Sequence, residues 1–509
     1  MISDVITYGK ETNRMEQNIV QQLPMWKKWM YALGQFGWSL AGYAVGSKLV
    51  YFYLPPSGMN MGPFVVQGNV VPLIRSSGMV VFGLTIIGLV FAFGRLFDAI
   101  TDPLIAGLSD RSKSKIGKRR SFLALSVAPF AIFSALVFFP ITPGISALNT
   151  VWLFASVFLF YWFMTMYVTP FFALLPELGH SPAERLQLST FISITWALGT
   201  VVGSQVERFQ GMFEAAGLSS TAAFQTVVSI YAIIAFIFML LPIIFIDEKK
   251  YCERSVSQGS IFKSVINAFK NKNFLTFTLS DLAYWVSITI INTVLVYFVM
   301  ELLKLPKDFS STLVMVMFLL SFVFYVPVNL VAKKTGKKPL LISAFVLFIV
   351  TFIYSTFLGL YPFPAEVQGL IVVLLAAIPL AIFGIIQNAI VSDIAEADAI
   401  ETGDSKSAIF FGARTFMSKL GQTLAGLVIP SLLLIGADLS KVGSDVIVSD
   451  VASGGAITGS LGVRITAVVA AVFCAIGLLL FLLYDEKKTL SVLAKKEKLS
   501  SDELKELKQ

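Results

Sequence analysis

Long apolar segments recur along almost the whole chain, and this feature most limits what the chain can fold into. They run from Trp29 to Asp485 and are separated by short stretches rich in proline, glycine or charged residues. A helix of about 20 apolar residues crosses a hydrocarbon core of about 30 Å. Of the 509 residues, 56% are hydrophobic and only 14% are charged, whereas about a quarter of positions are charged in soluble domains. The sequence therefore predicts an all-α membrane protein with about twelve transmembrane helices.

The predicted spans fall into two sets of six. The first set covers 29–54, 79–108, 121–140, 148–178, 186–206 and 222–246, and the second covers 274–300, 310–331, 339–360, 369–394, 408–435 and 463–484. We therefore expect a cytoplasmic segment (1–28), an N-terminal bundle (29–246), a cytoplasmic linker (247–273), a C-terminal bundle (274–484) and a cytoplasmic tail (485–509). The linker sequence SIFKSVINAFKNK is amphipathic at helical spacing and is expected to lie on the membrane surface.

Lysine and arginine are concentrated in alternate connections, at 111–120, 249–272 and 333–338. The positive-inside rule then places both termini and the linker in the cytoplasm. Anionic lipid headgroups beside these loops account for the net charge of +8, so no nucleic-acid partner is needed. We expect a monomer in the cell membrane, in contact with the lipid bilayer.

The motifs of most enzyme classes are missing from the sequence. It has no Walker loop, no dinucleotide fingerprint and no nucleophile elbow. With one histidine, His180, and two separated cysteines, it offers no structural zinc site and no disulfide framework. These absences favour a protein that is not an enzyme and needs no cofactor other than a coupling ion.

A weak internal sequence repeat relates the two halves of the chain. The segment DPLIAGLSDRSKSKIGKRRSF follows the second span, and VPVNLVAKKTGKKPL follows the eighth. Each contains a proline, small residues and then a glycine–lysine basic turn, as internal repeats of secondary transporters do. The acids of the first segment have no counterpart in the second.

The second predicted span carries charges inside an apolar helix. Arg95, Asp98 and Asp102 lie at positions i, i+3 and i+7, with Thr101 alongside, so they share one helix face. An ionised carboxylate facing lipid costs at least about 2.5 kcal/mol, so this face must point into the bundle. Hard oxygen ligands of this kind suit a small cation, and two close acids also suit a proton. The alternative is that these acids only form ion pairs with Arg95 and the basic loop and so act as a latch at the cytoplasmic surface. We favour this structural role for Asp110 and Arg111, which form a predicted cytoplasmic gate with Lys118 and Arg119.

The predicted counter-charge is Lys419 on the eleventh span, with Thr415 one turn earlier and Gln422 nearby. A buried lysine needs a partner or loses its proton. The acids available on interior faces are Asp98, Asp102 and Asp281. Arg414 either contributes to this site or reaches back to the cytoplasmic surface.

Four motifs carry a resemblance to a known family: DAITDP, SKIGKRRSF, FFALLPEL and RTFMSKLGQTLAG. Together they resemble the glycoside–pentoside–hexuronide:cation symporters of the major facilitator superfamily, of which the melibiose carrier is the best-known type. The resemblance implies a major facilitator fold with two six-helix bundles. It also implies that Asp98 and Asp102 bind the coupling Na⁺ or H⁺, that Thr101 and Thr165 join them, and that Lys419 is the family's lysine.

The sugar-binding positions depart from the family. Its sugar-binding acids correspond to Ser39 and Val168, a tryptophan to Phe172, and an arginine to about Ser193. The resemblance therefore extends to the coupling site and does not extend to galactoside recognition.

The remaining polar and aromatic residues of the predicted spans supply candidates for a substrate site. For each aromatic residue the alternative is helix packing or a place in the interfacial belt. Charges inside a span are functional by default, and Lys48 could meet an anionic group. The candidates are Gln35, Trp38, Ser39, Tyr43, Lys48, Tyr161, Trp162, Phe172, Asp281, Trp285, Asn292, Gln387 and Asn388.

Together these features favour symport of a sugar or glycoside with Na⁺ or H⁺ by alternating access. One alternative is a lysolipid or amphiphile symporter of the same superfamily. The other is a membrane sensor that binds a small molecule without transporting it. The sequence alone does not choose between the two ions.

Overall fold

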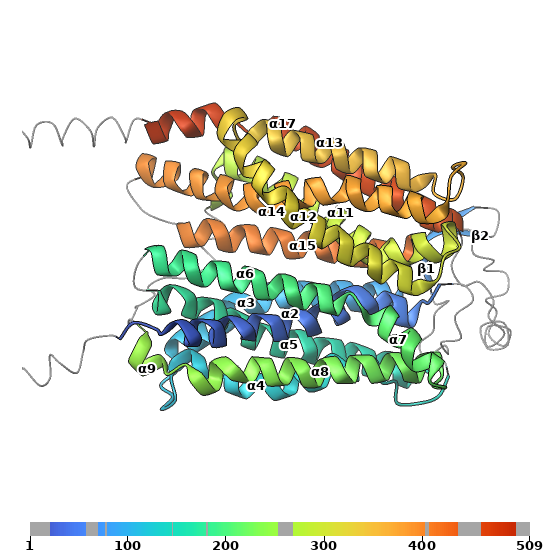
Figure 1. Cartoon of the computed structure of the whole chain (residues 1–509), viewed down its shortest axis with the longest axis horizontal. Helices are drawn as coiled ribbons and strands as arrows, with labels where there is room; N and C mark the ends of the chain where they lie inside the picture. The colour runs from blue at the N-terminus through green and yellow to red at the C-terminus, as the bar shows by residue number, and fades with distance from the viewer. Residues whose placement is uncertain are drawn as a thin grey trace, which may run out of the picture.

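The structure is a computed structural model that describes residues 21–56, 70–76, 79–144, 146–179, 182–252, 268–402, 407–435 and 460–494. Long helices run side by side in two groups, blue to green and yellow to red in Figure 1. The first group holds α2 (Met25–Tyr53), α3 (Ile86–Arg111), α4 (Lys118–Leu136), α5 (Ala147–Leu178), α6 (Pro182–Gly203) and α8 (Ser220–Phe245). The second holds α11 (Lys272–Tyr297), α12 (Lys307–Thr335), α13 (Lys337–Thr356), α14 (Ala365–Thr402), α15 (Ser407–Leu433) and α17 (Ser460–Leu482).

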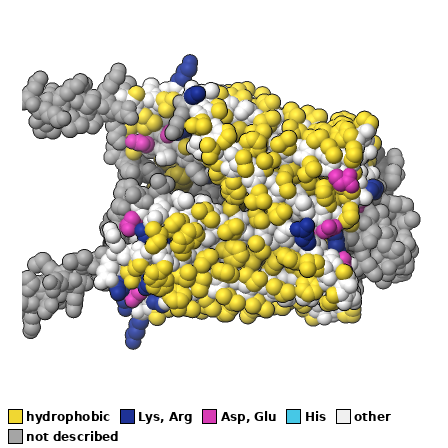
Figure 2. All heavy atoms as spheres, viewed as in Figure 1, with side chains coloured by type: hydrophobic (Ala, Val, Ile, Leu, Met, Phe, Trp, Pro, Cys, Tyr) yellow, Lys and Arg dark blue, Asp and Glu magenta, His cyan; other side chains and the backbone are white. Residues whose placement is uncertain are grey.

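Each predicted span overlaps one of these helices, and the predicted helical membrane fold is confirmed. In the described part of the chain, nine helices are long and apolar enough to cross a membrane by length and composition. The other three long helices, α2, α3 and α6, are not among these nine; α2 holds Lys48, and α3 holds Arg95, Asp98 and Asp102. On the face shown in Figure 2, hydrophobic side chains cover most of both bundles, as membrane contact requires.

A β-hairpin and a short helix were not expected. The predicted span 79–108 begins too early, because Met79–Thr85 is strand β2, which pairs antiparallel with β1 (Val70–Ser76). The helix starts where Thr85 accepts a hydrogen bond from the backbone N–H of Gly88 at 3.0 Å, an N-cap contact. The other is α7 (Val206–Ala215), a short helix between α6 and α8. A short π-helical turn, η1 (Phe298–Leu302), extends α11.

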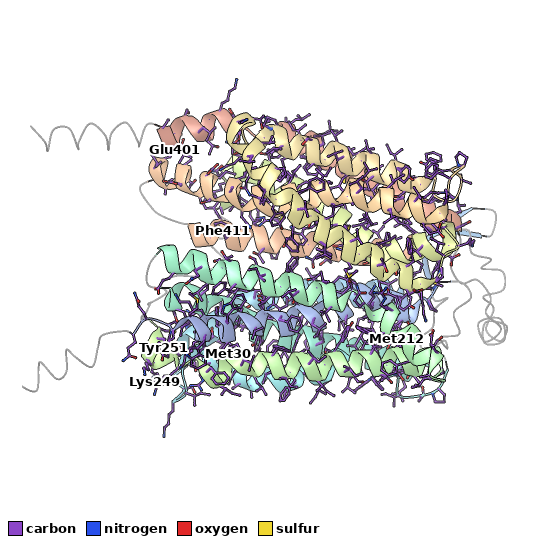
Figure 3. All side chains as sticks on the ribbon, viewed as in Figure 1. Met30, Met212, Lys249, Tyr251, Glu401 and Phe411 are labelled. Atoms are coloured by element: carbon purple, nitrogen blue, oxygen red, sulfur yellow. The ribbon has the colours of Figure 1, made fainter. Side chains whose placement is uncertain are left out.

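The two ends of the molecule are distinct. The start of α2, the short helix α9 (Glu248–Tyr251) and the end of α14 lie at one end, with Lys249, Tyr251 and Glu401 (Figures 1 and 3). Helix α7, marked by Met212, and the β-hairpin lie at the other (Figures 1 and 3). The positive-inside rule makes the first of these the cytoplasmic end. Of the predicted linker and tail, residues 253–267 and 495–509 lie outside the described parts, and with them most of the segment SIFKSVINAFKNK.

The internal sequence repeat has a structural counterpart at the cytoplasmic end, where the two bundles form equivalent contacts. A DEKK sequence follows the last helix of each bundle, at 247–250 and 485–488. Glu248 accepts hydrogen bonds from the first backbone N–H groups of α4, those of Lys118, Arg119 and Arg120, at 2.9, 3.0 and 2.9 Å. Glu486 does the same for Lys337 and Lys338 of α13, at 2.9 and 3.2 Å. Each bundle thus stabilises the start of its third helix with a carboxylate placed after its sixth.

Gly117, just before α4, is required for this contact. Its φ is +124°, and a Cβ there would lie 2.3 Å from Oε2 of Glu248. We predict that Gly117→Ala lowers the melting temperature more than Gly217→Ala does. Gly217 also has a positive φ, +99°, but its Cβ would meet nothing within 4 Å. Both variants strain the backbone, while only Gly117→Ala displaces the capping carboxylate, which contributes about 0.5–2 kcal/mol.

The measurement is a thermal unfolding curve of each purified variant in the same detergent. Equal losses for the two glycine variants would show that the Glu248 contacts contribute nothing to stability.

Candidate functional site

A cavity of about 890 Å³ lies between the two bundles. Its walls come from α2, α3, α5 and α6 on one side and mainly from α11 and α15 on the other. Its lining reaches Phe269 and Gly412, which lie at the cytoplasmic ends of α11 and α15. Figure 2 shows the corresponding hollow between the bundles, at the cytoplasmic end. The described conformation is therefore open towards the cytoplasm.

The opposite end is closed by contacts between the bundles. Lys307 of α12 binds both carboxylate oxygens of Glu214 of α7, at 2.5 and 2.6 Å. The Ser311 hydroxyl donates to Oε2 of Glu207 at 3.0 Å. The Tyr297 hydroxyl donates to the backbone carbonyl of Leu54 at 2.6 Å. Helix α7 thus provides much of the outer closure.

Asp98 lies in the wall of the cavity and is fully buried. Its Oδ1 accepts a hydrogen bond from the Thr165 hydroxyl at 2.6 Å. The Thr101 hydroxyl lies 3.2 Å from the backbone carbonyl of Asp98 and 3.3 Å from the Thr165 hydroxyl. The spacing of α3 therefore brings together the predicted residues of the cation site with the threonine of α5.

Asp102 lies one turn further along α3 and is more accessible, with 28% of its side chain exposed. Its Oδ1 accepts a hydrogen bond from the Thr169 hydroxyl at 3.0 Å. We did not predict Thr169 from the sequence, although it lies one turn after Thr165 on the same face of α5, a spacing that could have suggested it. The two acids and the three threonines form a set of hard oxygen atoms that fits Na⁺.

Lys419 of α15 joins this cluster from the other bundle. Its Nζ lies 2.9 Å from Oδ2 of Asp98 and 2.6 Å from Oδ2 of Asp102. Arg95 forms no ion pair with either acid among the described contacts, although it lies on the same face of α3. The two acids thus pair with Lys419 across the bundle interface. The alternative prediction, that they pair with Arg95, does not apply to the described contacts.

Of the other residues predicted near Lys419, Thr415 and Gln422 face the cavity and Arg414 does not. Thr415 and Gln422 line the cavity, and the Thr415 hydroxyl donates to the backbone carbonyl of Phe411 at 3.0 Å. Arg414 faces the interior of the C-terminal bundle, where its Nε lies 2.9 Å from Oδ2 of Asp281. It therefore does not reach back to the cytoplasmic surface.

The predicted substrate residues divide into two groups. Seven line the cavity: Trp38, Ser39, Tyr43, Tyr161, Phe172, Trp285 and Asn292. Six are not among the lining residues: Gln35, Lys48, Trp162, Asp281, Gln387 and Asn388. The wall also holds Trp196, Thr200 and Phe318, which we did not predict, because nothing in the sequence distinguishes them from packing residues.

Two of the groups outside the lining have charged partners of their own. Lys48 lies 2.5 Å from Oε1 of Glu207, and the two side chains are 4% and 0% exposed. Arg414 donates to Gln387 and Asn388 at 2.5 and 2.6 Å in addition to Asp281. Gln387 also donates to Asp281. Lys48 and Asp281 are therefore neutralised within their own bundles.

The predicted cytoplasmic gate is only partly described. Arg119 forms an ion pair with Glu177 of α5 at 2.8 Å. The backbone N–H groups of Lys118 and Arg119 bind Glu248, as described above, and Arg111 is exposed. The side chain of Asp110 lies outside the described part.

The chain is similar to known transport proteins. The sequence profile of the family described as MFS/sugar transport protein matches residues 30–487. The isoprimeverose transporter of Lactiplantibacillus pentosus is 24% identical over 64% of this chain and 63% of its own length. The inner membrane symporter YicJ of Escherichia coli K12 is 24% identical over 45% of this chain and 48% of its own. The chain therefore spans less than two thirds of the length of these relatives.

Other similarities are more distant or more local. The sodium-dependent lysophosphatidylcholine symporter 1 of Xenopus tropicalis is 29% identical over 22% of this chain and 22% of its own. Among solved structures, the nucleoside transporter NupG has a TM-score of 0.59 at 14% identity, over 89% of this chain and 98% of its own. The D-xylose–proton symporter has a TM-score of 0.57 at 14% identity, over 88% and 96%. These likenesses to solved structures show the fold.

The pairing of Lys419 predicts a specific stability effect. Lys419→Met leaves two carboxylates in the cavity without their counter-charge, and we expect a loss of about 1–3 kcal/mol, because Asp102 is partly exposed to water. Adding Asp98→Asn and Asp102→Asn to the same chain removes the unpaired charges and should restore most of the loss. The measurement is the thermal unfolding midpoint in detergent at neutral pH.

The double variant Asp98→Asn/Asp102→Asn, with Lys419 present, is the matched control. It should be destabilised too, because it leaves the lysine without a partner. If neither variant lowers the midpoint, the three charges do not stabilise one another.

Proposed function

The chain belongs to the MFS/sugar transport protein family, and we propose that it is a symporter that couples Na⁺ or H⁺ to the transport of a sugar or glycoside. It is a multi-pass membrane transporter of a small molecule, and proteins of this family and fold are not enzymes. The coupling ion and the substrate class are the proposal.

The observation that carries the coupling proposal is the position of Lys419 Nζ between the carboxylates of Asp98 and Asp102. The lysine comes from one bundle and the acids from the other, so their attraction holds the two bundles in a defined arrangement. A cation that binds these oxygens competes directly with the ammonium group. Its entry would weaken the tie across the interface, which is the step that alternating access needs.

The residues around the two acids would supply oxygen ligands to a coupling ion. The side-chain oxygens of Asp98 and Asp102 and the hydroxyls of Thr101, Thr165 and Thr169 lie close together on α3 and α5. Carboxylate and hydroxyl oxygens suit Na⁺, and a proton on one acid would free Lys419 in the same way. Either ion therefore fits the mechanism.

The wall of the cavity supports a hydroxylated ring as the substrate. Trp38 of α2 and Phe172 of α5 pack edge to face, with ring centroids 6.3 Å apart, on one side. Trp285 lies on the other. The buried indole Nε1 of Trp38 and the amide Oδ1 of Asn292 have no hydrogen-bond partner among the described residues. Aromatic faces for the ring and unsatisfied polar atoms for its hydroxyls are what a sugar requires.

A lysolipid is the second candidate. The local similarity to a lysophosphatidylcholine symporter and the many aromatic and aliphatic residues of the cavity wall favour it. A sensor that binds without transport is the third. Thermal-shift screening of the purified protein against sugars and lysolipids, with and without Na⁺, separates the ligands. Flux into liposomes separates a transporter from a sensor.

The coupling proposal predicts the behaviour of two conservative variants. Asp98→Asn and Asp102→Asn should each abolish accumulation of substrate against its gradient, because the cation loses a charged ligand. Exchange of substrate across the membrane should remain at least in part, since it needs no net cation movement. The measurement is uptake of radiolabelled substrate into liposomes, with an imposed Na⁺ or pH gradient and then with substrate on both sides. Full gradient-driven accumulation by both variants would refute coupling at these acids.

A further inference from the structure

Helix α15 belongs to the C-terminal bundle, yet it carries the lysine that binds the acids of the other bundle. It lies on the side of its bundle that faces the other one (Figure 1), and it packs against both α11 and α3. One face of α15 lines the cavity, with Gly412, Thr415, Lys419 and Gln422 at helical spacing. The rotation of α15 about its own axis therefore decides whether Lys419 reaches the two aspartates of α3.

Packing alone does little to fix that rotation, because both neighbours approach α15 at a glycine. A Cβ on Gly421 would lie 2.6 Å from the backbone carbonyl oxygen of Leu282 on α11. A Cβ on Gly426 would collide with the ring of Phe91 on α3. Glycines let helices lie close together, but they lack the side-chain ridges that interlock with the grooves of a neighbour. The orientation of α15 thus needs another restraint.

Arg414 supplies a directional contact of this kind. Its Nε lies 2.9 Å from Oδ2 of Asp281 on α11. Its Nη1 and Nη2 donate to Oδ1 of Asn388 and Oε1 of Gln387 on α14, at 2.6 and 2.5 Å. Gln387 also donates to Oδ1 of Asp281, so both carboxylate oxygens are engaged. A planar guanidinium with three partners is fixed in its orientation, and it ties α15 to two helices of its own bundle.

The spacing along α15 turns this anchor into a direction for Lys419. Arg414 and Lys419 are five residues apart, so their side chains leave the helix about 140° apart. Arg414 points into its own bundle, and Lys419 then points out of it towards α3. A helix has a radius of about 5–6 Å with its side chains, so a rotation of about 30° moves a side-chain end by about 3 Å. That movement would separate the ammonium group from carboxylates that it now contacts at 2.9 and 2.6 Å.

Neither stability nor contact with a substrate accounts for the pair of Asp281 and Arg414. The two side chains are 0% and 13% exposed. Replacing an ion pair buried to this degree by apolar residues of similar volume is often neutral for stability, because the desolvation of both charges offsets their attraction. Neither residue is among those that line the cavity. A defined orientation of α15 is the property that this pair supplies and an apolar pair does not.

We infer that Asp281 and Arg414 are positioning residues, which hold α15 so that Lys419 pairs with the two aspartates of α3. Gln387 and Asn388 complete the anchor by fixing the plane of the guanidinium. The inference rests on the proposed function, in which a cation displaces Lys419 from those aspartates. The anchor acts on that exchange through the helix and without touching the ion.

The first test measures how strongly Lys419 stabilises the protein when the anchor is absent. Asp281→Asn/Arg414→Gln removes both charges together, so no lone charge is left buried. Lys419→Met should lower the thermal unfolding midpoint of this background by less than half of what it does in the unchanged chain, because the lysine no longer meets the acids. Asp281→Leu/Arg414→Met is a second neutral background, in which we expect the same result. Equal losses with and without the anchor would make the effects additive and would overturn the inference.

Two control variants separate positioning from a general loosening of the protein. Arg119→Gln/Glu177→Gln removes an ion pair of 2.8 Å whose side chains are each 10% exposed, and it should leave the full effect of Lys419→Met. Arg414→Lys keeps the charge but not the fork that binds three partners, so the effect of Lys419→Met should be intermediate there. A reduced effect in the Arg119→Gln/Glu177→Gln background would show that loss of any buried ion pair weakens the lysine's contribution, which overturns the inference.

The second test uses Na⁺ as a probe of the aspartates. With Lys419 turned away, Na⁺ meets less competition there. The NaCl concentration that gives half of the rise in melting temperature should therefore fall about 10-fold in Asp281→Asn/Arg414→Gln, with choline chloride keeping the ionic strength constant. An unchanged or higher concentration would overturn the inference. Loss of the Lys419→Met effect without any response to NaCl in either chain would support the positioning role and refute Na⁺ as the coupling ion, so the two conclusions can fail separately.

Discussion

The attraction between Lys419 and the two aspartates of α3 is the interaction on which the arrangement of the two bundles depends. It lies between helices that belong to different halves of the chain, and it is the only one of the described ion pairs in which one base binds two acids. Each of the three charges would be unfavourable in the membrane interior without the others. A helix pair held in this way is sensitive to any ion that replaces the ammonium group, so under the proposed coupling the same atoms would serve both stability and transport.

Much of the fold and part of the site could be predicted from the sequence, for physical reasons that differ between residues. Bilayer thickness imposes a minimum length on each apolar segment, so each long helix was found, although the predicted boundaries are wrong at the start of α3 and at the end of α14. The acids of α3 and Lys419 were found because a charge in an apolar helix needs a partner. The partner of Lys48 was not found, because Glu207 belongs to α7, a short amphipathic helix that resembles a polar loop in the sequence. The β-hairpin was missed because its apolar residues continue directly into α3, and length alone does not separate strand from helix there.

The polar lining of the cavity was harder to predict than its charges. Thr169 forms a hydrogen bond with Asp102, yet a threonine in a membrane helix more often bonds to its own backbone, as Thr226 and Thr423 do here. Trp162 and Trp196 look alike in the sequence, but only Trp196 faces the cavity, because Trp162 packs against Phe97. Which face of a helix points inward depends on its rotation against its neighbours, and a single sequence constrains that rotation weakly.

The way Glu207 is held has a consequence for how the outer end can separate. One of its oxygens binds Lys48 of its own bundle, and the other accepts only a hydroxyl hydrogen bond from Ser311 of the opposite bundle. When the bundles move apart, the ion pair travels intact with one of them, and no lone carboxylate is stranded in an apolar environment. The ion pair between the bundles at this end, Glu214 with Lys307, has an acid that is 26% exposed, so water can solvate both partners when they separate. The outer end can therefore open and close at a small cost in free energy, as the proposed transport cycle requires.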